Sequence, residues 1–154
     1  MFLERLVLPE GLATKSIVET SELVLDSAVA RHLVQALRVR KGAEFRIGDG
    51  AGLSRLASVL EIERRSLKVS WLGKATQLPR PEPEIILCLA MIDPTDLRRA
   101  IEGAVESGVD RIVLFKAEYS NRAVPVEGSA LWEKILKNIR SSAEQSRRPW
   151  VPAL

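Results

Sequence analysis

The sequence has very little of the two residue types that most often mark metal and disulfide sites. It contains one cysteine, Cys88, and one histidine, His32, among 154 residues. A single cysteine excludes an internal disulfide framework and fits a reducing cytosol. A lone histidine without clustered partners does not make a zinc-type site and is more often structural. We therefore expect no bound metal.

Long apolar runs and the common catalytic signatures are also absent. No apolar stretch approaches the roughly 20 residues that a membrane-spanning helix needs, and the beginning of the chain lacks the basic and apolar regions of a signal peptide. The sequence has no P-loop, no dinucleotide fingerprint and no recognisable catalytic triad. These absences predict a cytoplasmic protein without a membrane partner.

The residues that are present form an ordinary globular composition with a small excess of cations. Hydrophobic residues make up 46% and charged residues 28% of the chain, which supports one domain or two small ones with a real core. The formal net charge of +3 says little about nucleic acid, because clustering of the cations matters more than their sum.

Alternating prolines in residues 77–83 separate two differently patterned halves. Such a segment favours an extended, semi-rigid linker and excludes a helix. We therefore predict one domain at 1–74, a proline-rich linker at 75–83 and a second domain at 84–154.

The first half has the pattern of short strands around one helix. The predicted strands are 2–8, 16–25, 43–47, 53–62 and 67–72, and the predicted helix is 27–37. The glycine-rich stretch Gly48–Gly52 lies between two strands, so a hairpin turn is favoured over a phosphate cradle. This pattern predicts a small closed barrel, since closure removes sheet edges.

The second half alternates strands and helices. The predicted elements are an apolar strand at 84–90, a helix at 93–107, a strand at 111–115 and a helix at 129–146. Asp93 before Pro94 marks the first helix start, and Gly108 suits its end. This β-α-β-α order predicts an open parallel sheet that is incomplete, because a two-stranded sheet is marginal without further strands from the chain or a partner.

Cations near the first helix and polar residues in the second half are the candidate contacts. Those of the first half are His32, Arg38, Arg40, Lys41 and Arg46, which could contact RNA phosphates or simply complement a helix end. Arg122, beside Ser120 and Asn121, could bind a phosphate or form a surface ion pair. Gln145 and Arg148 could read a base edge and bind phosphate, or cap the last helix.

An ordered set of motifs resembles one known family. The matching segments are Arg5; His32 to Arg38 with Gly42; Gly48-Asp49-Gly50; Glu106-Ser107-Gly108-Val109; Ser120-Asn121-Arg122; Trp132; and Ala143-Glu144-Gln145-Ser146 with Arg148 and Pro152. In this order they resemble the RsmE family, the 16S ribosomal RNA (uracil-N3)-methyltransferases of the SPOUT class.

The resemblance implies a fold, an activity and roles for the candidate residues. The fold would be α/β, with an N-terminal PUA-like β-barrel followed by an incomplete SPOUT-type parallel domain. The activity would be methyl transfer from S-adenosylmethionine to uracil N3 of 16S rRNA in the small ribosomal subunit, by a homodimer. The RNA-binding candidates are Arg5, His32, Arg38, Arg40 and Lys41. The catalytic candidates are Arg122, Gln145 and Arg148.

Departures from the family pattern leave the activity of this chain open. Asp93 and Gly103 stand where the family usually carries lysines. The family's Gly-Pro-Glu-Gly-Gly and Leu-Arg-x-Glu-Thr segments, which form the cofactor-binding knot, would follow Leu154, so the resemblance implies no cofactor-binding residue in this chain. We expect the chain alone to be inactive. One alternative is a non-catalytic RNA-binding module, a truncated paralogue, and another is a scaffold whose sheet edge pairs with a partner.

Overall fold

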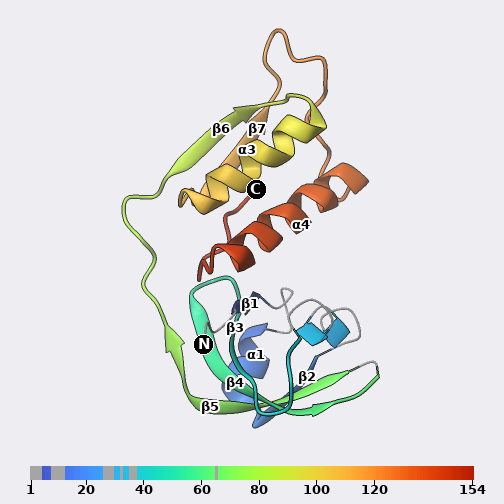
Figure 1. Cartoon of the computed structure of the whole chain (residues 1–154). Helices are drawn as coiled ribbons and strands as arrows, with labels where there is room; N and C mark the ends of the chain where they lie inside the picture. Colours follow the sequence, from blue (N-terminus) through green and yellow to red (C-terminus); the bar gives the residue numbers. More distant parts are fainter. Residues whose placement is uncertain (1–4, 8–12, 26–29, 32, 35–37, 65) are drawn as a thin grey trace. The chain divides into compact units, whose positions relative to one another are not determined.

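A computed structural model describes residues 5–7, 13–25, 30–31, 33–34, 38–64 and 66–154. The chain divides into two compact units, Met1–Leu78 and Pro79–Leu154, and the division falls within the proline-rich segment (Figure 1). Among the described residues, no helix has the length and apolar character needed to cross a membrane.

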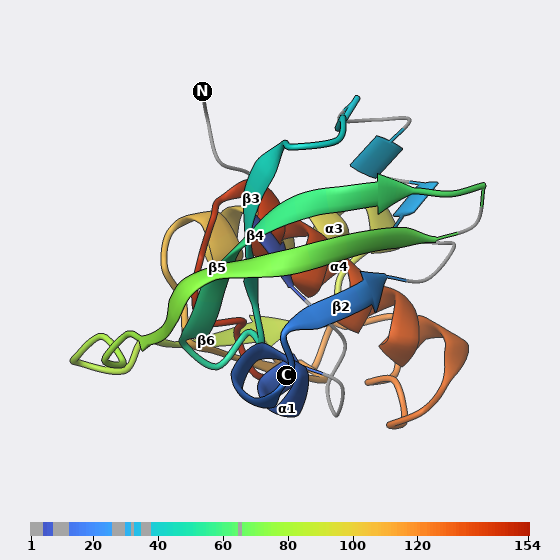
Figure 2. The same cartoon turned by 90° about the horizontal axis from the view of Figure 1, so that it is seen from below.

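The first unit is a five-stranded sheet that curls around one core. Its strands are β1 (Arg5–Val7), β2 (Glu22–Leu25), β3 (Glu44–Gly48), β4 (Leu53–Ile62) and β5 (Leu67–Gln77), in the order β1-β3-β4-β5-β2. β1 pairs parallel with β3. The other pairs, which join β3, β4, β5 and β2, are antiparallel (Figure 2). Alternate residues, including Val59, Val69 and Trp71, are buried in the core. Within the described residues no pairing joins the two edge strands, β1 and β2.

A helix occupies part of the segment where a strand is expected. Residues Ala13–Glu19 form α1, and only the later part of the predicted strand 16–25 is extended, as β2. The β-branched pair Ile17 and Val18 favours a strand locally. Tertiary packing decides otherwise, because α1 contacts β3, β4 and β5 and places Ile17 fully in the core. The strand prediction was therefore wrong for residues 16–19.

The glycine-rich stretch between β3 and β4 is a hairpin turn, as predicted. Asp49 Oδ1 accepts hydrogen bonds from the Ala51 amide at 2.7 Å and the Leu53 amide at 3.1 Å, and Gly50 has a φ of 77° that only glycine adopts easily. Most of the helix predicted at 27–37 lies outside the described residues. Ala30 and Leu33, which are described, are helical and buried.

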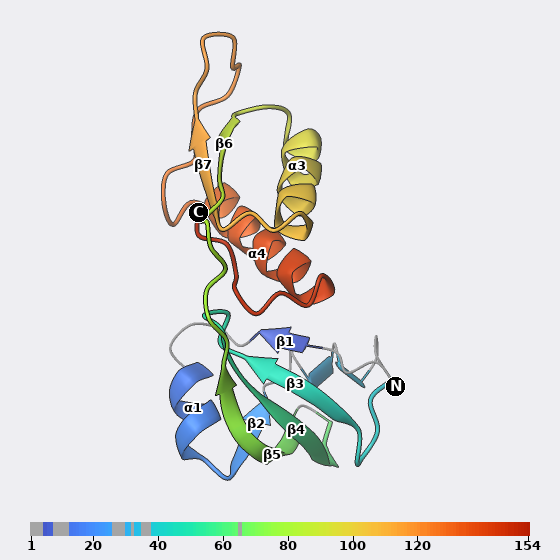
Figure 3. The same ribbon diagram turned by 90° about the vertical axis from the view of Figure 1, so that its left-hand side faces the viewer.

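The second unit is a two-stranded parallel sheet with two helices on one face. Its elements are β6 (Ile86–Ala90), α3 (Pro94–Glu106), β7 (Arg111–Phe115) and α4 (Ala130–Gln145). Both helices lie on the same side of β6 and β7 (Figures 1 and 3). Leu87, Leu89, Ile112 and Leu114 pack into the core with them. The fold is thus mixed α/β, with a parallel sheet in this unit.

The N-cap predicted at Asp93 is confirmed, and the last helix begins after Ser129, where its start was predicted. Asp93 accepts a hydrogen bond from the Thr95 amide at 3.0 Å and begins α3, and Ser129 accepts one from the Trp132 amide at 3.3 Å and begins α4. Gly108, with a φ of 99°, follows the end of α3. After α4 the chain returns to β7, where Ala153 forms a parallel bridge with Arg111.

Candidate functional site

Arg122 lies in the loop that follows β7, at the carboxyl end of the sheet. Its Nη2 atom is 3.8 Å from Oδ2 of Asp93, the residue that caps α3. Both side chains are more than half exposed, so this ion pair is worth less than about 1 kcal/mol. The loop itself is fixed by the Ser120 hydroxyl, which accepts a hydrogen bond from the Ala117 amide at 3.2 Å. The Arg122 guanidinium therefore remains accessible at the edge where open α/β sheets bind ligands.

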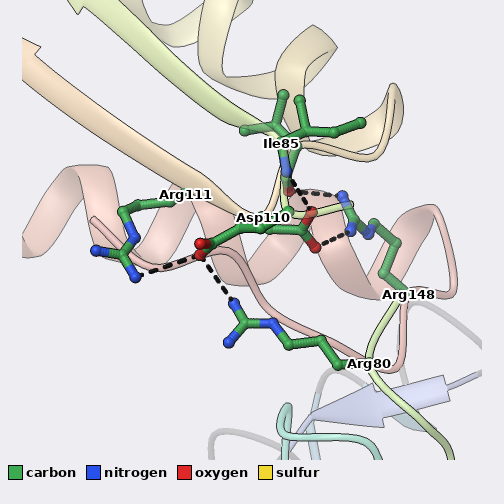
Figure 4. Close-up of polar contacts among 7 residues, drawn as sticks. Arg80, Ile85, Asp110, Arg111 and Arg148 are labelled. Carbon is green, nitrogen blue, oxygen red and sulfur yellow. Dashed lines mark hydrogen bonds and ion pairs between the residues drawn. The ribbon is translucent and has the colours of Figure 1, made fainter. Parts of the chain in front are cut away.

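Arg148 lies at the opposite end of the sheet and is held inside the unit. Its Nη1 donates hydrogen bonds to the Val105 and Val109 carbonyls at 2.9 and 2.8 Å. Its Nη2 lies 3.5 Å from Oδ1 of Asp110 (Figure 4). Oδ2 of Asp110 accepts a hydrogen bond from the Ile85 amide at 3.0 Å. The side chains of Arg148 and Asp110 are only 13% and 2% exposed. Arg148 thus joins the end of α3 to the amino ends of both strands.

A second group of charges ties the first and last segments of this unit together. Glu84 Oε1 lies 3.2 Å from Nη2 of Arg111 and 3.6 Å from Nη2 of Arg80 (Figure 4). The Arg80 guanidinium lies over the ring of Trp150, 5.7 Å from its centroid. The indole nitrogen of Trp150 donates to the Pro79 carbonyl at 3.2 Å. These contacts give both Arg80 and Trp150 a structural role within this unit.

The end of α4 contains a strained backbone position. Gln145 is the last helical residue and its side chain is exposed. Arg147, two residues later, has a φ of 56°, and the Arg148 amide donates to the Ala143 carbonyl at 2.8 Å. Glycine usually occupies this left-handed position after a helix, and another residue costs about 1–2 kcal/mol there. The strain lies between two predicted site residues, which is where functional sites often store it.

The structure does not bring the three catalytic candidates together within one chain. Arg122 lies beside Asp93, the N-cap of α3, whereas Arg148 donates to the carbonyl of Val105 near the end of that helix. The 13 residues of α3 span about 20 Å. Gln145 belongs with Arg148, because only two residues separate them. In a single subunit, Arg122 and Gln145 therefore face different regions of space.

The RNA-binding candidates of the first unit lie around the approach to β3. Arg38, Arg40 and Lys41 are all exposed, and Arg38 has a left-handed φ of 51°. The Ala43 amide donates to the Arg40 carbonyl at 2.9 Å, which closes the turn that presents these cations. They are thus accessible to a polyanion.

Two further candidates of this unit are described only in part or not at all. The backbone of Arg5 lies in β1 and is in register with Arg46 of β3. His32 lies outside the described residues. The roles predicted for both stay predictions.

A groove between α3 and α4 was not predicted from the sequence. We call it the cationic groove: Arg98, Arg99, Lys134 and Lys137 line it, over the apolar side chains Leu97, Ile101, Leu131 and Ile135. Its volume is about 530 Å³ and no acidic residue lines it. The sequence did carry a signal, since the lysines lie three residues apart on one helix and therefore share a face.

Two family models match the chain in succession. Residues 25–70 match an RNA methyltransferase PUA domain, and residues 79–154 match an RNA methyltransferase domain. The chain belongs to the RNA methyltransferase family. The family's two parts, in this order, correspond to the strand-rich unit and to the parallel α/β unit.

Individual relatives agree with this assignment. The ribosomal RNA small subunit methyltransferases E of Mycobacterium bovis and Mycobacterium tuberculosis are each 30% identical over 134 residues, covering 84% of this chain and 49% of the relative. The chain spans about half the length of these two relatives. A crystal structure of the Neisseria gonorrhoeae ribosomal RNA small subunit methyltransferase E bound to S-adenosyl methionine has a TM-score of 0.77 and 23% identity, over 99% of this chain and 60% of that one.

The cationic groove does not fit that cofactor. S-adenosylmethionine carries a permanent positive charge on its sulfonium, and four cationic side chains without an acidic neighbour in the lining repel such a group. We therefore assign no cofactor role to this groove.

Proposed function

We propose that this chain is part of an rRNA methyltransferase that transfers a methyl group from S-adenosylmethionine to N3 of a uracil in 16S rRNA. The observation that carries the proposal is the match to two small-subunit rRNA methyltransferases across 84% of the chain, through both units. The PUA-domain match of the first unit supports RNA as the partner. We place the protein in the cytoplasm because its relatives are named for acting on ribosomal RNA.

The residue roles follow from accessibility. The exposed Arg38, Arg40 and Lys41 contact the rRNA backbone through charge. The family resemblance adds Arg5 and His32 to this RNA-binding set. Arg122 and Gln145 contact the target nucleotide. Arg148 does not contact the nucleotide and instead positions Gln145. Its guanidinium is held by Asp110 and two backbone carbonyls, and this anchoring fixes the turn that follows Gln145.

A homodimer reconciles these roles with the geometry. Arg122 and Gln145 lie at opposite ends of the second unit, about the length of α3 apart. Two subunits packed through this unit can bring Arg122 of one beside Gln145 of the other. Sedimentation velocity of the chain with small-subunit rRNA fragments is expected to show two protein copies; a strictly monomeric species would contradict this arrangement.

RNA binding is the first test. Fluorescence anisotropy with a labelled fragment of 16S rRNA is expected to show binding that weakens steeply with salt, because phosphate contacts release counterions. The double variant Arg40→Gln/Lys41→Gln should bind the rRNA fragment more weakly. The charge-preserving control Arg40→Lys/Lys41→Arg should bind it as the unmodified chain does. Absent or salt-insensitive binding of the unmodified chain would contradict rRNA as the partner.

Methyl transfer is tested separately from binding. The 154-residue chain alone is expected to bind the rRNA fragment without transferring radiolabelled methyl groups. A chimera that continues after Leu154 with the remaining C-terminal part of the Neisseria gonorrhoeae relative is expected to methylate small subunits that lack the modification. A folded chimera that binds S-adenosylmethionine and rRNA but transfers no methyl group would exclude the enzyme.

The second candidate is a non-catalytic RNA-binding module. It is favoured by one observation: Arg148, a catalytic candidate, is occupied by structural contacts within the unit. Unimpaired rRNA binding by the chain together with an inactive chimera would support this module over the enzyme.

A further inference from the structure

The cationic groove between α3 and α4 takes no part in the roles assigned above. The two helices lie side by side on one face of the sheet (Figure 3). The Asn138 side chain of α4 donates a hydrogen bond to the Arg98 carbonyl of α3 at 3.2 Å. Beneath the rim, Leu97, Ile101 and Ile135 are buried. The groove therefore has fixed walls and an apolar floor.

The cations on the rim of the groove differ in whether they have an acidic partner. On α3, Arg98 Nε lies 2.9 Å from Glu102, and Arg99 Nη1 lies 4.0 Å from Asp96. On α4, Lys134 and Lys137 are exposed and form no ion pair or hydrogen bond with any residue that the structure describes. Like charges three residues apart on one helix repel each other. The two lysines thus lie on one face of α4 beside the groove, with no counter-charge among the described residues to hold them in place.

We propose that the cationic groove binds the sugar-phosphate backbone of RNA, with Lys134 and Lys137 contacting phosphates. A phosphate between the two lysines would relieve their repulsion, and the apolar floor suits the flat face of a ribose or base. The arginines of α3 add donors on the facing wall. The inference rests on the proposed function for the presence of RNA, but it assigns a surface and a contact class that the proposed function leaves out.

The test compares two double variants of the same chain. Lys134→Gln/Lys137→Gln removes both charges and keeps good helix formers, and Lys134→Arg/Lys137→Arg keeps the charges. Anisotropy with the labelled 16S rRNA fragment is read between 50 and 300 mM salt. The glutamine variant should bind on the order of tenfold more weakly at low salt, and its log–log salt slope should fall by roughly 1.4, about 0.7 for each lost phosphate contact. The arginine variant should match the unmodified chain.

The outcomes separate this inference from the proposed function. If the unmodified chain binds no rRNA, the proposed function fails. If it binds and the glutamine variant, folded by circular dichroism, binds with the same affinity and salt slope, only the groove inference is overturned. It is equally overturned if the glutamine variant alters the sedimentation coefficient but not RNA affinity, because the groove is then an interface between copies. Loss of binding to an oligoglutamate peptide with RNA binding unchanged would assign the groove to an acidic protein segment instead.

Discussion

The guanidinium of Arg148 and the carboxylate of Asp110 form an ion pair at the amino ends of β6 and β7, and both side chains are almost completely buried. Arg148→Met should destabilise the chain by roughly 3 kcal/mol, because it leaves a buried carboxylate without its counter-charge and removes the arginine donor from the Val105 and Val109 carbonyls. Urea unfolding followed by circular dichroism measures this loss.

A double variant separates two contributions to this loss: the missing ion pair itself, and the cost of leaving the Asp110 carboxylate charged and buried. Arg148→Met/Asp110→Asn should recover part of the loss, since no charge then remains buried. The exposed Arg99→Met is the matched control and should change stability by less than about 0.5 kcal/mol. Equal unfolding midpoints for Arg148→Met and Arg99→Met would refute a structural role for Arg148.

Replacing Arg147 by glycine should stabilise the chain. Its left-handed φ of 56° after α4 is strained for arginine, so Arg147→Gly should gain up to about 1 kcal/mol despite the greater freedom of glycine in the unfolded chain. Arg147→Ala, which keeps the strain, is the comparison and should not gain. Thermal unfolding of both variants decides between them, and a lower midpoint for the glycine variant would show that the arginine's interactions outweigh the strain.

Arg38 combines strain with accessibility, so one substitution should move two properties in opposite directions. Arg38→Gly removes a left-handed arginine with a φ of 51° and an exposed cation. We expect stability to rise slightly and rRNA affinity to fall, with a salt slope reduced by about 0.7–1. Unchanged affinity in the same anisotropy assay would remove Arg38 from the RNA-binding set.

The ion pair between Lys68 and Glu22 should contribute to how the stability of the first unit changes with pH in the alkaline range. Lys68 Nζ lies 2.5 Å from Oε2 of Glu22, and this hydrogen bond raises the pKa of Lys68 above its ordinary value of 10.5. A raised pKa in the folded state contributes stability below 10.5 that is lost as the pH rises through the folded value. Glu22→Gln should therefore lower the Lys68 pKa. Above about pH 10, the free energy of unfolding should then fall less steeply with pH than in the unmodified chain. NMR titration of the Lys68 ammonium group measures the shift, and an unchanged titration in Glu22→Gln would refute the assignment.

Local signals predicted the second unit well. The N-caps Asp93 and Ser129, the proline after Asp93 and the glycine at 108 mark helix ends by backbone chemistry that needs no distant partner. The buried side of α3, including Leu97, Ile101 and Val105, follows from helical periodicity alone.

Non-local contacts explain what the sequence did not predict. The conformation of Ile17 depends on strands up to 60 residues away, and its β-branched side chain gave the opposite local preference. The burial of Arg148 depends on Asp110, whose only signal is an acidic residue placed directly before an apolar strand. An arginine at a helix end has the same sequence pattern whether it faces a ligand or a buried carboxylate, so its role required the structure.

The bridge between Ala153 and Arg111 has a consequence for amide exchange along β7. The Ile112 amide donates to the Ala153 carbonyl at 2.8 Å, whereas the Leu114 amide, which points to the same side by strand alternation, has no acceptor among the described residues. Deuterium should therefore enter at Leu114 well before Ile112, although the two amides belong to one short strand. The change from slow to fast exchange therefore marks the point along β7 beyond which its outer edge has no hydrogen-bonded neighbour among the described residues.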